Sequence, residues 1–237
     1  MSTNQRNQFF SAILTGAMAN QSFKGKPAAS TMRHLWKLAD MAVYHGEHRE
    51  SPRDIALRWL GKNYVIIDTE TTGLGDDAQI VEIAIIDLKG NVLIDTLIKP
   101  TIDIPEEATA IHGITNEMVS DSPSWLDVLP DVVNSMGDRW IAYNAEFDKK
   151  MIKQVSGGLL DTEFLKVLNP FCAMKLYAEF NGEWDVYRRQ YKWKKLVDAA
   201  TTLNVWPEVT DNDTPHRALF DCRLTLRVIH AIAGVEL

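Results

Sequence analysis

The stretch YVIIDTETTGL, from Tyr64 to Leu74, runs an apolar segment directly into two carboxylates and then a turn. The apolar residues predict a buried strand over Tyr64–Asp68, and side chains two residues apart on a strand point to the same face. Asp68 and Glu70 therefore share a face, at a separation suited to one hard cation or a pair of them. Taken alone, the two acids could simply close the strand and solvate its turn, so the site interpretation needs further ligands.

The composition indicates a globular protein that acts at local sites rather than through its bulk charge. The chain has 237 residues and is 46% hydrophobic, enough for one sizeable domain or a domain plus an extension. Its 32 acidic and 25 basic residues give a net charge of -7, which argues against coating duplex nucleic acid but leaves a local basic groove open. Cys172 and Cys222 form no disulfide framework or zinc motif, so we expect a reducing, cytoplasmic compartment. No apolar run approaches the roughly twenty residues of a membrane span.

Residues 1–60 are predicted to form a helical N-terminal extension, and residues 61–237 the main domain. Apolar residues recur at helix-like spacing over Phe9–Leu14 and Met32–Val43, and Ser51 is a plausible cap for a third, short helix. The first of these segments could instead be a targeting sequence, but its weak charge argues against that.

From Tyr64 onward the spacing of apolar residues predicts an α/β domain with a mixed five-stranded sheet flanked by helices. The expected strands are Tyr64–Asp68, Gln79–Asp87, Asn91–Lys99, Trp140–Tyr143 and Phe171–Met174. The second and third of them should form an antiparallel hairpin. The expected helices are Pro105–Ile111, a short one capped by Thr115, Val128–Met136, Lys149–Val155, Lys175–Phe180, Lys194–Leu203 and a long one opened by Thr214 and Pro215 that runs to Ala233.

Two more acids fall at comparable places in these elements. Asp148 follows the fourth strand at the start of a helix, where it could also merely complement the helix dipole, and Asp221 lies near the start of the last helix. Together with Asp68 and Glu70 they make a ligand set for two divalent ions, and oxygen ligands favour Mg²⁺ or Mn²⁺ over zinc. Two such ions about 4 Å apart stabilise the attacking and leaving oxygens of a phosphodiester displacement. His216 could then take a proton from the attacking water.

Four motifs carry a family resemblance. DTETTGL at 68–74, IHGIT at 111–115, NAEFD at 144–148 and HRALFD at 216–221 resemble the ordered motifs of the DEDDh, or DnaQ-like, 3′-to-5′ exonucleases of the ribonuclease H-like superfamily. The resemblance covers roughly residues 62–233; each motif alone is weak, and all of them in order are specific. His216 precedes Asp221 by five residues, as in the histidine branch, and Arg217 stands where the tyrosine branch has tyrosine.

The resemblance implies a ribonuclease H-like fold and a role for each acid. Asp68 would bridge two metal ions, Glu70 and Asp221 would complete the site of the ion that activates water, and Asp148 would support the second ion, partly through water. His216 would be the general base. Five residues on a regular helix turn by about 140°, so His216 and Asp221 cannot both face the site from one helix, and a loop for His216 is expected.

The resemblance also implies where the substrate binds. The segment with Thr69, Thr71, Gly73 and Leu74 would meet the terminal nucleotide, with Leu74 as an apolar wedge against the last base. His112 lies in a motif that lines the nucleotide pocket, although it could instead be a histidine that packs its loop.

The third motif contributes further expected substrate contacts through Asn144 and Phe147. Tyr143 departs from the family pattern, which commonly has histidine before Asn-Ala, and this puts the hydrogen bonding around the site in doubt rather than metal binding.

Outside the motifs, the segment YRRQYKWKK at Tyr187–Lys195 interleaves basic and aromatic residues. Such a segment can follow the phosphates of a strand while it stacks on the bases. It could equally be a solvated basic face at the start of a helix.

The expected function is hydrolysis of nucleic acid from its 3′ end with two Mg²⁺ or Mn²⁺ ions, releasing nucleoside 5′-monophosphates. DNA with single-stranded ends is favoured, because the segment Thr69–Gly73 resembles the proofreading and repair members. The alternatives are an exoribonuclease and a non-catalytic nucleic-acid or protein-binding module, whose signature would be a lost carboxylate or histidine. A polymerase or repair protein could be a partner, through Phe9, Phe10 or Trp36, or these residues could pack on the main domain.

Overall fold

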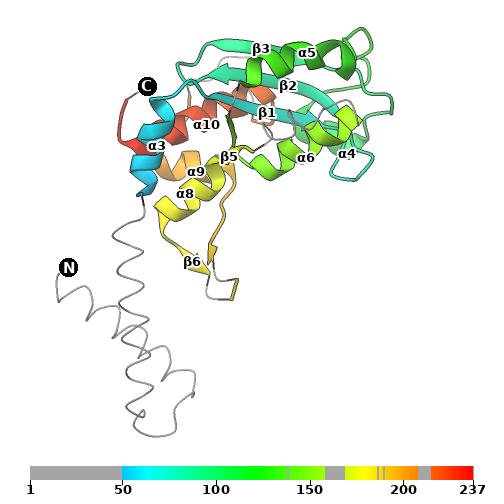
Figure 1. Ribbon diagram of the computed structural model, residues 1–237. Helices are drawn as coiled ribbons and strands as arrows, with labels where there is room; N and C mark the ends of the chain where they lie inside the picture. Colours follow the sequence, from blue (N-terminus) through cyan, green and yellow to red (C-terminus); the bar gives the residue numbers. More distant parts are fainter. Residues whose placement is uncertain are drawn as a thin grey trace, which may run out of the picture. The chain divides into compact units, whose positions relative to one another are not determined.

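Strand β1 (Val65–Thr71) occupies the centre of a five-stranded mixed sheet with the order β3-β2-β1-β4-β5 (Figure 1). The other strands are β2 (Ile80–Asp87), β3 (Val92–Leu97), β4 (Trp140–Ala142) and β5 (Phe171–Cys172). β1, β2 and β3 pair antiparallel, whereas β1, β4 and β5 pair parallel. The predicted mixed five-stranded sheet is confirmed, with its first strand extended to include Glu70.

This computed structural model describes residues 50–137, 139–157, 169–185, 187–188, 190–207 and 215–236. Most of the predicted N-terminal extension, including Phe9, Phe10 and Trp36, lies outside these ranges. Among the described residues, no helix is both long and apolar enough to cross a membrane.

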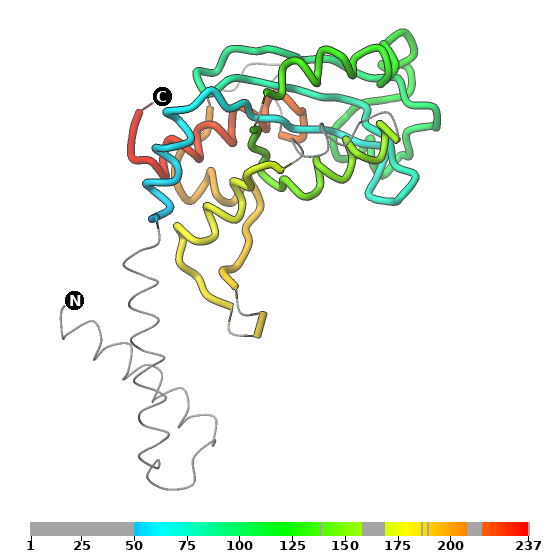
Figure 2. The backbone as a smooth tube through the Cα atoms, viewed as in Figure 1, coloured from blue at the N-terminus to red at the C-terminus, as the bar shows by residue number. Residues whose placement is uncertain are grey.

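Helices cover both faces of the sheet, and the tube in Figure 2 follows the chain between them. Their bounds are α3 (Pro52–Leu60), α4 (Glu106–His112), α5 (Trp125–Met136), α6 (Ala145–Ser156), α8 (Ala173–Asn181), α9 (Leu196–Leu203) and α10 (Ala218–Ala233). One core joins Ile66, Ala84, Ile86 and Ile141 to α3, α8, α9 and α10. The opposite core joins Val65, Ile67, Ile83, Ile85, Trp140 and Ala142 to α5 and α6.

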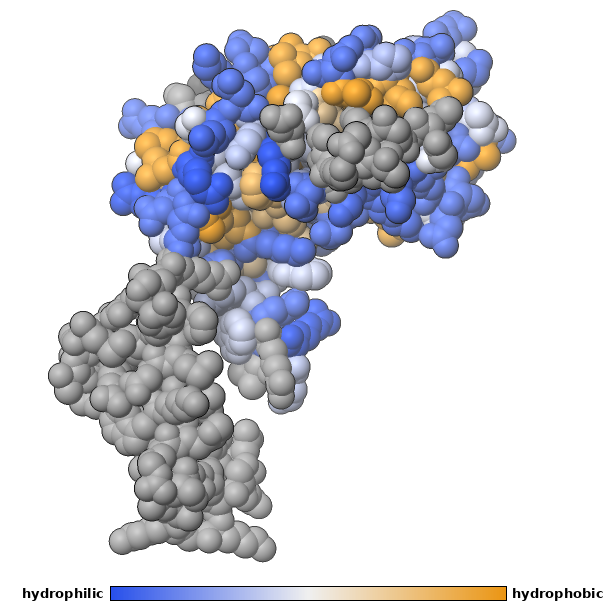
Figure 3. All heavy atoms as spheres, viewed as in Figure 1, coloured by the Kyte–Doolittle hydropathy of each residue, from blue (hydrophilic) through white to orange (hydrophobic). Residues whose placement is uncertain are grey.

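The alternation of β1 therefore assigns its side chains to two environments. Val65 and Ile67 belong to the core beneath α5 and α6, and Ile66 belongs to the core that contains α10. Asp68 and Glu70 continue the series of Ile66, so β1 directs both acids to the side of the sheet that carries α10. The exterior is mixed, and on the face in Figure 3 the hydrophobic residues form separate patches among hydrophilic ones.

Helix α3 belongs to the main domain, although the predicted boundary at residues 60 and 61 places it in the extension. Its Ala56 and Trp59 are buried in the same core as α10. Arg53 Nε donates a hydrogen bond of 3.1 Å to the carbonyl of Ala233, at the end of α10. The compact unit accordingly runs from Pro52 to Leu237.

Several local predictions differ from the structure. Helix α5 begins at Trp125 rather than Val128, α6 begins at Ala145 rather than Lys149, and β5 ends at Cys172 rather than Met174. The segment after Thr115 forms turns instead of a helix, and α10 begins at Ala218 rather than at Thr214 or Pro215. Two short paired strands were missed by the sequence analysis: β6 (Trp184–Asp185) lies just before the basic and aromatic segment, and β7 (Gln190–Tyr191) lies within it. Each of these strands has two residues, too few for a visible alternation of polar and apolar side chains.

We predict that Trp59→Ala lowers the free energy of unfolding by about 3–5 kcal/mol, because it removes a buried indole from the core. Leu57→Ala, in the same helix but 40% exposed, is the matched control and should stay within about 0.5 kcal/mol of the parent protein. Urea unfolding followed by circular dichroism measures both. Equal stability of the two variants would show that α3 does not stabilise the domain.

Candidate active site

Three of the four predicted acidic ligands meet at the end of β1. Asp68 and Glu70 come from β1, and Asp221 lies in the first turn of α10. One carboxylate oxygen from each residue lies within 4.8 Å of the others. The strand supplies two ligands on one face, and the helix that packs on that face supplies the third.

Asp148 approaches from α6, on the other side of β1. It lies in the first turn of that helix and is only 3% exposed. The hydroxyl of Thr69 donates a hydrogen bond of 2.9 Å to Asp148 Oδ1. Thr69 is also a predicted substrate residue, and its buried side chain orients a predicted metal ligand.

The protein environment makes all four carboxyl groups difficult to ionise. Burial raises the pKa of Asp68 well above its usual value, and the neighbouring Asp148, Asp221 and Glu70 raise it further. Burial, followed by the charges of Asp221 and Glu82, raises the pKa of Glu70 to about 8. Burial also raises the pKa of Asp148 and of Asp221 to about 7, against hydrogen bonds from Thr69 and from the His216 backbone that lower them. A cation at the site would relieve this repulsion.

The residues present fit a divalent cation. Asp221 Oδ1 is buried and has no hydrogen-bond partner among the described residues, so an oxygen ligand is available in the cluster. The donor atoms at the three-residue cluster are all carboxylate oxygens, which Mg²⁺ and Mn²⁺ prefer.

His216 lies outside the helix that carries Asp221. It is exposed, has a left-handed backbone with φ of 65°, and precedes α10, whose cap is Arg217. This confirms the expectation that the two residues do not share one regular helix. The charge of His216 contributes to lowering the pKa of His112, although burial of His112 is the larger cause.

An ion pair between a buried carboxylate and a partly exposed arginine, which the sequence analysis missed, fixes this junction. Glu82 of β2 is 2% exposed, and both of its carboxylate oxygens accept hydrogen bonds from Arg217 Nε, at 3.0 and 3.1 Å. Glu82 Oε2 also accepts a hydrogen bond of 2.9 Å from the backbone N–H of Ala218, the first residue of α10. The signal was a lone acid inside the apolar strand sequence IVEIAII, because a buried carboxylate needs a partner.

An apolar pocket of about 500 Å³ adjoins the carboxylates. Its lining includes predicted substrate residues and part of α4: Thr69, Glu70, Thr71, Thr72, Gly73, Leu74, Ala108, Ile111, His112 and Phe147. Leu74 and Ile111 are 79% and 61% exposed. Large apolar side chains are therefore available at this pocket for contact with another molecule.

Both ring nitrogens of His112 form hydrogen bonds with backbone atoms. Its Nδ1 accepts a hydrogen bond of 3.0 Å from the Ile114 N–H, so Nε2 carries the proton and faces the Thr71 carbonyl at 3.3 Å. Burial lowers the pKa of His112, consistent with a neutral ring. The two alternatives for His112 thus coincide, because it lines the pocket while it packs the loop.

The two predicted substrate residues of the third motif differ in their exposure to solvent. Asn144 is exposed at the N-cap of α6, and Phe147 is partly buried at the pocket wall. Tyr143 is buried, and its hydroxyl donates a hydrogen bond of 3.0 Å to the carbonyl of Lys194. The tyrosine at this position thus connects the motif to the segment before α9.

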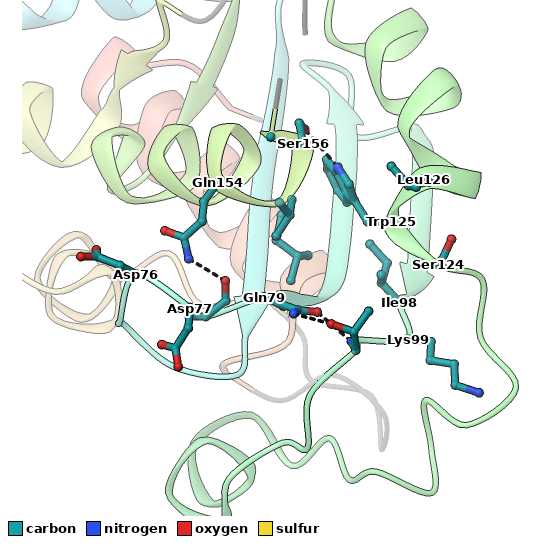
Figure 4. A pocket seen from close by; sticks show the side chains of 15 residues that line it. Asp76, Asp77, Gln79, Ile98, Lys99, Ser124, Trp125, Leu126, Gln154 and Ser156 are labelled. Atoms are coloured by element: carbon teal, nitrogen blue, oxygen red, sulfur yellow. Dashed lines mark hydrogen bonds between the residues drawn. The ribbon is translucent and has the colours of Figure 1, made fainter. Parts of the chain in front are cut away.

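A second pocket, of about 530 Å³, is lined partly by the loop after Leu74, including Asp76 and Asp77 (Figure 4). Among the described residues that line it, none is a predicted site residue. Gln154 Nε2 donates to the carbonyl of Ala78 at 2.7 Å, and Gln79 Nε2 donates to the hydroxyl of Thr101 at 2.7 Å. These bonds fasten the loop that leads from the carboxylates into β2.

The chain is similar in sequence to known nucleases. A family model described as exonuclease, RNase_T, matches residues 65–229. A protein of Escherichia phage 186 named uncharacterized exonuclease CP81 is 48% identical over 183 residues, covering 75% of this chain and 92% of its own length. Exodeoxyribonuclease 10 of Escherichia coli (strain K12) is 33% identical over 173 residues, covering 69% of this chain and 66% of its own length.

A solved structure shares the fold. Exonuclease X in complex with 5′ overhanging duplex DNA matches with a TM-score of 0.55 and 29% identity, over 73% of this chain and 94% of the other. The predicted ribonuclease H-like fold is thereby confirmed. The family model and the phage relative each span most of the chain. The chain therefore belongs to the RNase_T exonuclease family, the DEDDh or DnaQ-like group that its motifs predict.

Proposed function

We propose that the protein is a metal-dependent 3′-to-5′ exodeoxyribonuclease that releases nucleoside 5′-monophosphates. The observation that carries the proposal is the position of the carboxylate cluster of Asp68, Glu70 and Asp221 beside an apolar pocket. With divalent cations bound, the cluster would suit the negatively charged phosphodiester, and the pocket suits the flat, largely apolar terminal base. A site that binds the terminal nucleotide of a strand needs groups for both the phosphate and the base.

The choice of DNA rests on two of the relatives. One is named exodeoxyribonuclease 10, and the structure of Exonuclease X contains duplex DNA. The choice of the 3′ end rests on the resemblance of the four motifs to the DEDDh exonucleases. RNA is the competing substrate, and matched oligonucleotides distinguish the two.

The acidic side chains have distinct tasks in this proposal. Asp68 would help to hold both cations, Glu70 and Asp221 would hold the first, and Asp148 would support the second. Two Mg²⁺ or Mn²⁺ ions, when bound, stabilise the attacking and leaving oxygens of the displacement. Thr69 keeps Asp148 oriented through its hydrogen bond of 2.9 Å.

The remaining residues act on the water and on the nucleotide. His216 Nδ1 or Nε2 accepts a proton as the water oxygen attacks phosphorus, and the P–O3′ bond breaks. The shortened strand regains a proton on its 3′ oxygen, and the released nucleotide keeps the 5′-phosphate. Leu74 and Ile111 contact the terminal base, and the His112 ring holds the Thr71 carbonyl in place beneath it.

We predict that Asp68→Ala lowers DNA degradation at least about 1,000-fold, because loss of about 4 kcal/mol of transition-state stabilisation has that effect. Asp131→Ala, which removes an exposed acid of α5, is the matched control and should leave the rate unchanged. The assay uses 5′-labelled DNA and RNA oligonucleotides of one sequence with Mg²⁺, where 3′-to-5′ removal gives a ladder of shortened products. Faster degradation of RNA, or equal activity of Asp68→Ala, would overturn the proposal.

We predict that His216→Ala lowers kcat about 100- to 10,000-fold, the usual contribution of a general base. The carboxylates are untouched, so Mg²⁺ should raise the Tm of the variant as much as that of the parent protein. Single-turnover kinetics and thermal unfolding measure the two effects. A variant that loses the Mg²⁺ response would show that His216 supports the metal site instead.

The raised carboxyl pKa values predict an inverse dependence of stability on pH in metal-free protein. The folded state keeps protons that the unfolded state releases above about pH 4, so stability falls as pH rises toward the folded values of about 7 and 8. In EDTA, the Tm should therefore decrease between about pH 5 and pH 8, and Mg²⁺ should restore it more at the higher pH. Asp68→Asn should flatten both responses, and an unchanged profile in that variant would contradict the coupling.

A further inference from the structure

The β6–β7 ribbon, residues 183–195 without the undescribed 186 and 189, is not used by the proposed reaction. It connects α8 to α9 and extends away from the sheet (Figures 1 and 2). Its turn is closed by Asp185 Oδ1, which accepts hydrogen bonds of 2.9 Å from the backbone N–H groups of Tyr187 and Arg188. Tyr187, at the tip, is 98% exposed.

One face of the ribbon carries aromatic side chains. Trp184 pairs directly with Tyr191, and their rings meet edge to face with centroids 5.1 Å apart. Trp193 follows Tyr191 by two residues, beyond the end of β7. Trp184 and Trp193 are 50% and 51% exposed, so about half of each indole is available to another molecule.

The other face carries charge. Lys192 and Lys194 both reach Glu183, with Nζ to oxygen distances of 2.6 and 2.8 Å. These side-chain hydrogen bonds lower the pKa of Glu183 to about 2 and hold the two lysines on one side. Segment 183–195 contains five basic and two acidic residues, in a chain with a net charge of -7.

The ribbon is anchored to the edge of the active site. The Tyr143 hydroxyl donates to the carbonyl of Lys194, and Tyr143 directly precedes Asn144, the N-cap of the helix that carries Asp148. Lys175, at the start of α8, forms an ion pair of 3.8 Å with Glu146 in that helix. The ribbon is thus continuous with the motif that holds one of the four acids.

We propose that the β6–β7 ribbon is a second nucleic-acid contact, which binds the single-stranded segment 5′ of the scissile phosphate. The proposal rests on the proposed exonuclease function. Half-exposed aromatic rings with excess positive charge are the combination that binds single strands, because bases stack on the rings and phosphates attract the cations. Trp184 and Trp193 stack on bases, while Arg188 and Lys195 lie near phosphates.

Substrates of different length distinguish a role of the ribbon in substrate binding from a role in the chemical step. The full-length protein is assayed on the p-nitrophenyl ester of thymidine 5′-monophosphate, which is too small to reach the ribbon, and on single-stranded dT4 and dT20. The double variant Trp184→Ala/Trp193→Ala should lower kcat/KM on dT20 about 5- to 100-fold, the usual effect of losing a base–aromatic stack, and leave the ester unchanged. Trp184→Phe, which keeps a stacking ring, should retain most of the dT20 activity.

A direct measurement of DNA binding tests the ribbon independently of catalysis. Fluorescence anisotropy with labelled dT20 in metal-free buffer should give a Kd about 5- to 100-fold weaker for the double variant. Phe180→Ala, which removes an aromatic residue of α8 that is 43% exposed, is the matched control and should bind as the parent protein does. If the double variant binds dT20 normally, or loses ester hydrolysis equally, the ribbon is not a nucleic-acid contact, and an interface for a protein would remain for its aromatic face. A parent protein that binds dT20 through the ribbon but hydrolyses nothing would refute the proposed function alone.

Discussion

Four carboxyl groups lie close together at the end of one central strand, where their negative charges repel one another. The other elements of the fold have to accommodate this repulsion. Asp68 and Glu70 are fixed by the alternation of β1, and Asp148 and Asp221 arrive on helices from opposite faces of the sheet. Burial raises the pKa of each of these groups, well above the usual value for Asp68, to about 8 for Glu70 and to about 7 for Asp148 and Asp221. Two apolar cores, one on each face of the sheet, hold the backbone at these four residues in place against this repulsion. The site is therefore stabilised from a distance, by the packing of these two cores.

The ion pair between Glu82 and Arg217 performs a different task from the four acids. Glu82 accepts from the backbone N–H of Ala218 as well as from the guanidinium, so it fixes both where α10 begins and how the preceding residue enters it. The left-handed His216 then stands immediately outside the helix. One buried carboxylate on the neighbouring strand thus separates the proposed base from the proposed metal ligand, which a continuous helix could not do.

The sequence predicted most of the sheet, because strands such as Ile80–Asp87 are apolar along their length and end at clear turns. It also predicted that Asp68, Glu70 and Asp221 lie close together, because the short motifs that carry them lie in a specific order. It missed Glu82, whose partner is 135 residues away and cannot be recognised from local pattern. It placed the start of α10 too early, because Pro215 suits a first helical turn and the competing cap comes from β2. The ribbon at Trp184 was missed because two-residue strands depend on their partner rather than on their own periodicity.

The contact between α3 and the end of α10 has a consequence for how the domain can be joined to other sequences. Arg53 binds the carbonyl of Ala233, so the chain enters and leaves the compact unit at one place. Asp221 lies twelve residues before Ala233 on the same helix, which separates this place from the carboxylates by about 20 Å. Fusion partners, or a circular permutation that links the two ends, can therefore be accommodated there without crossing the catalytic face. The two ends of the compact unit meet near the C-terminal end of α10, and the acidic residues lie near its N-terminal end.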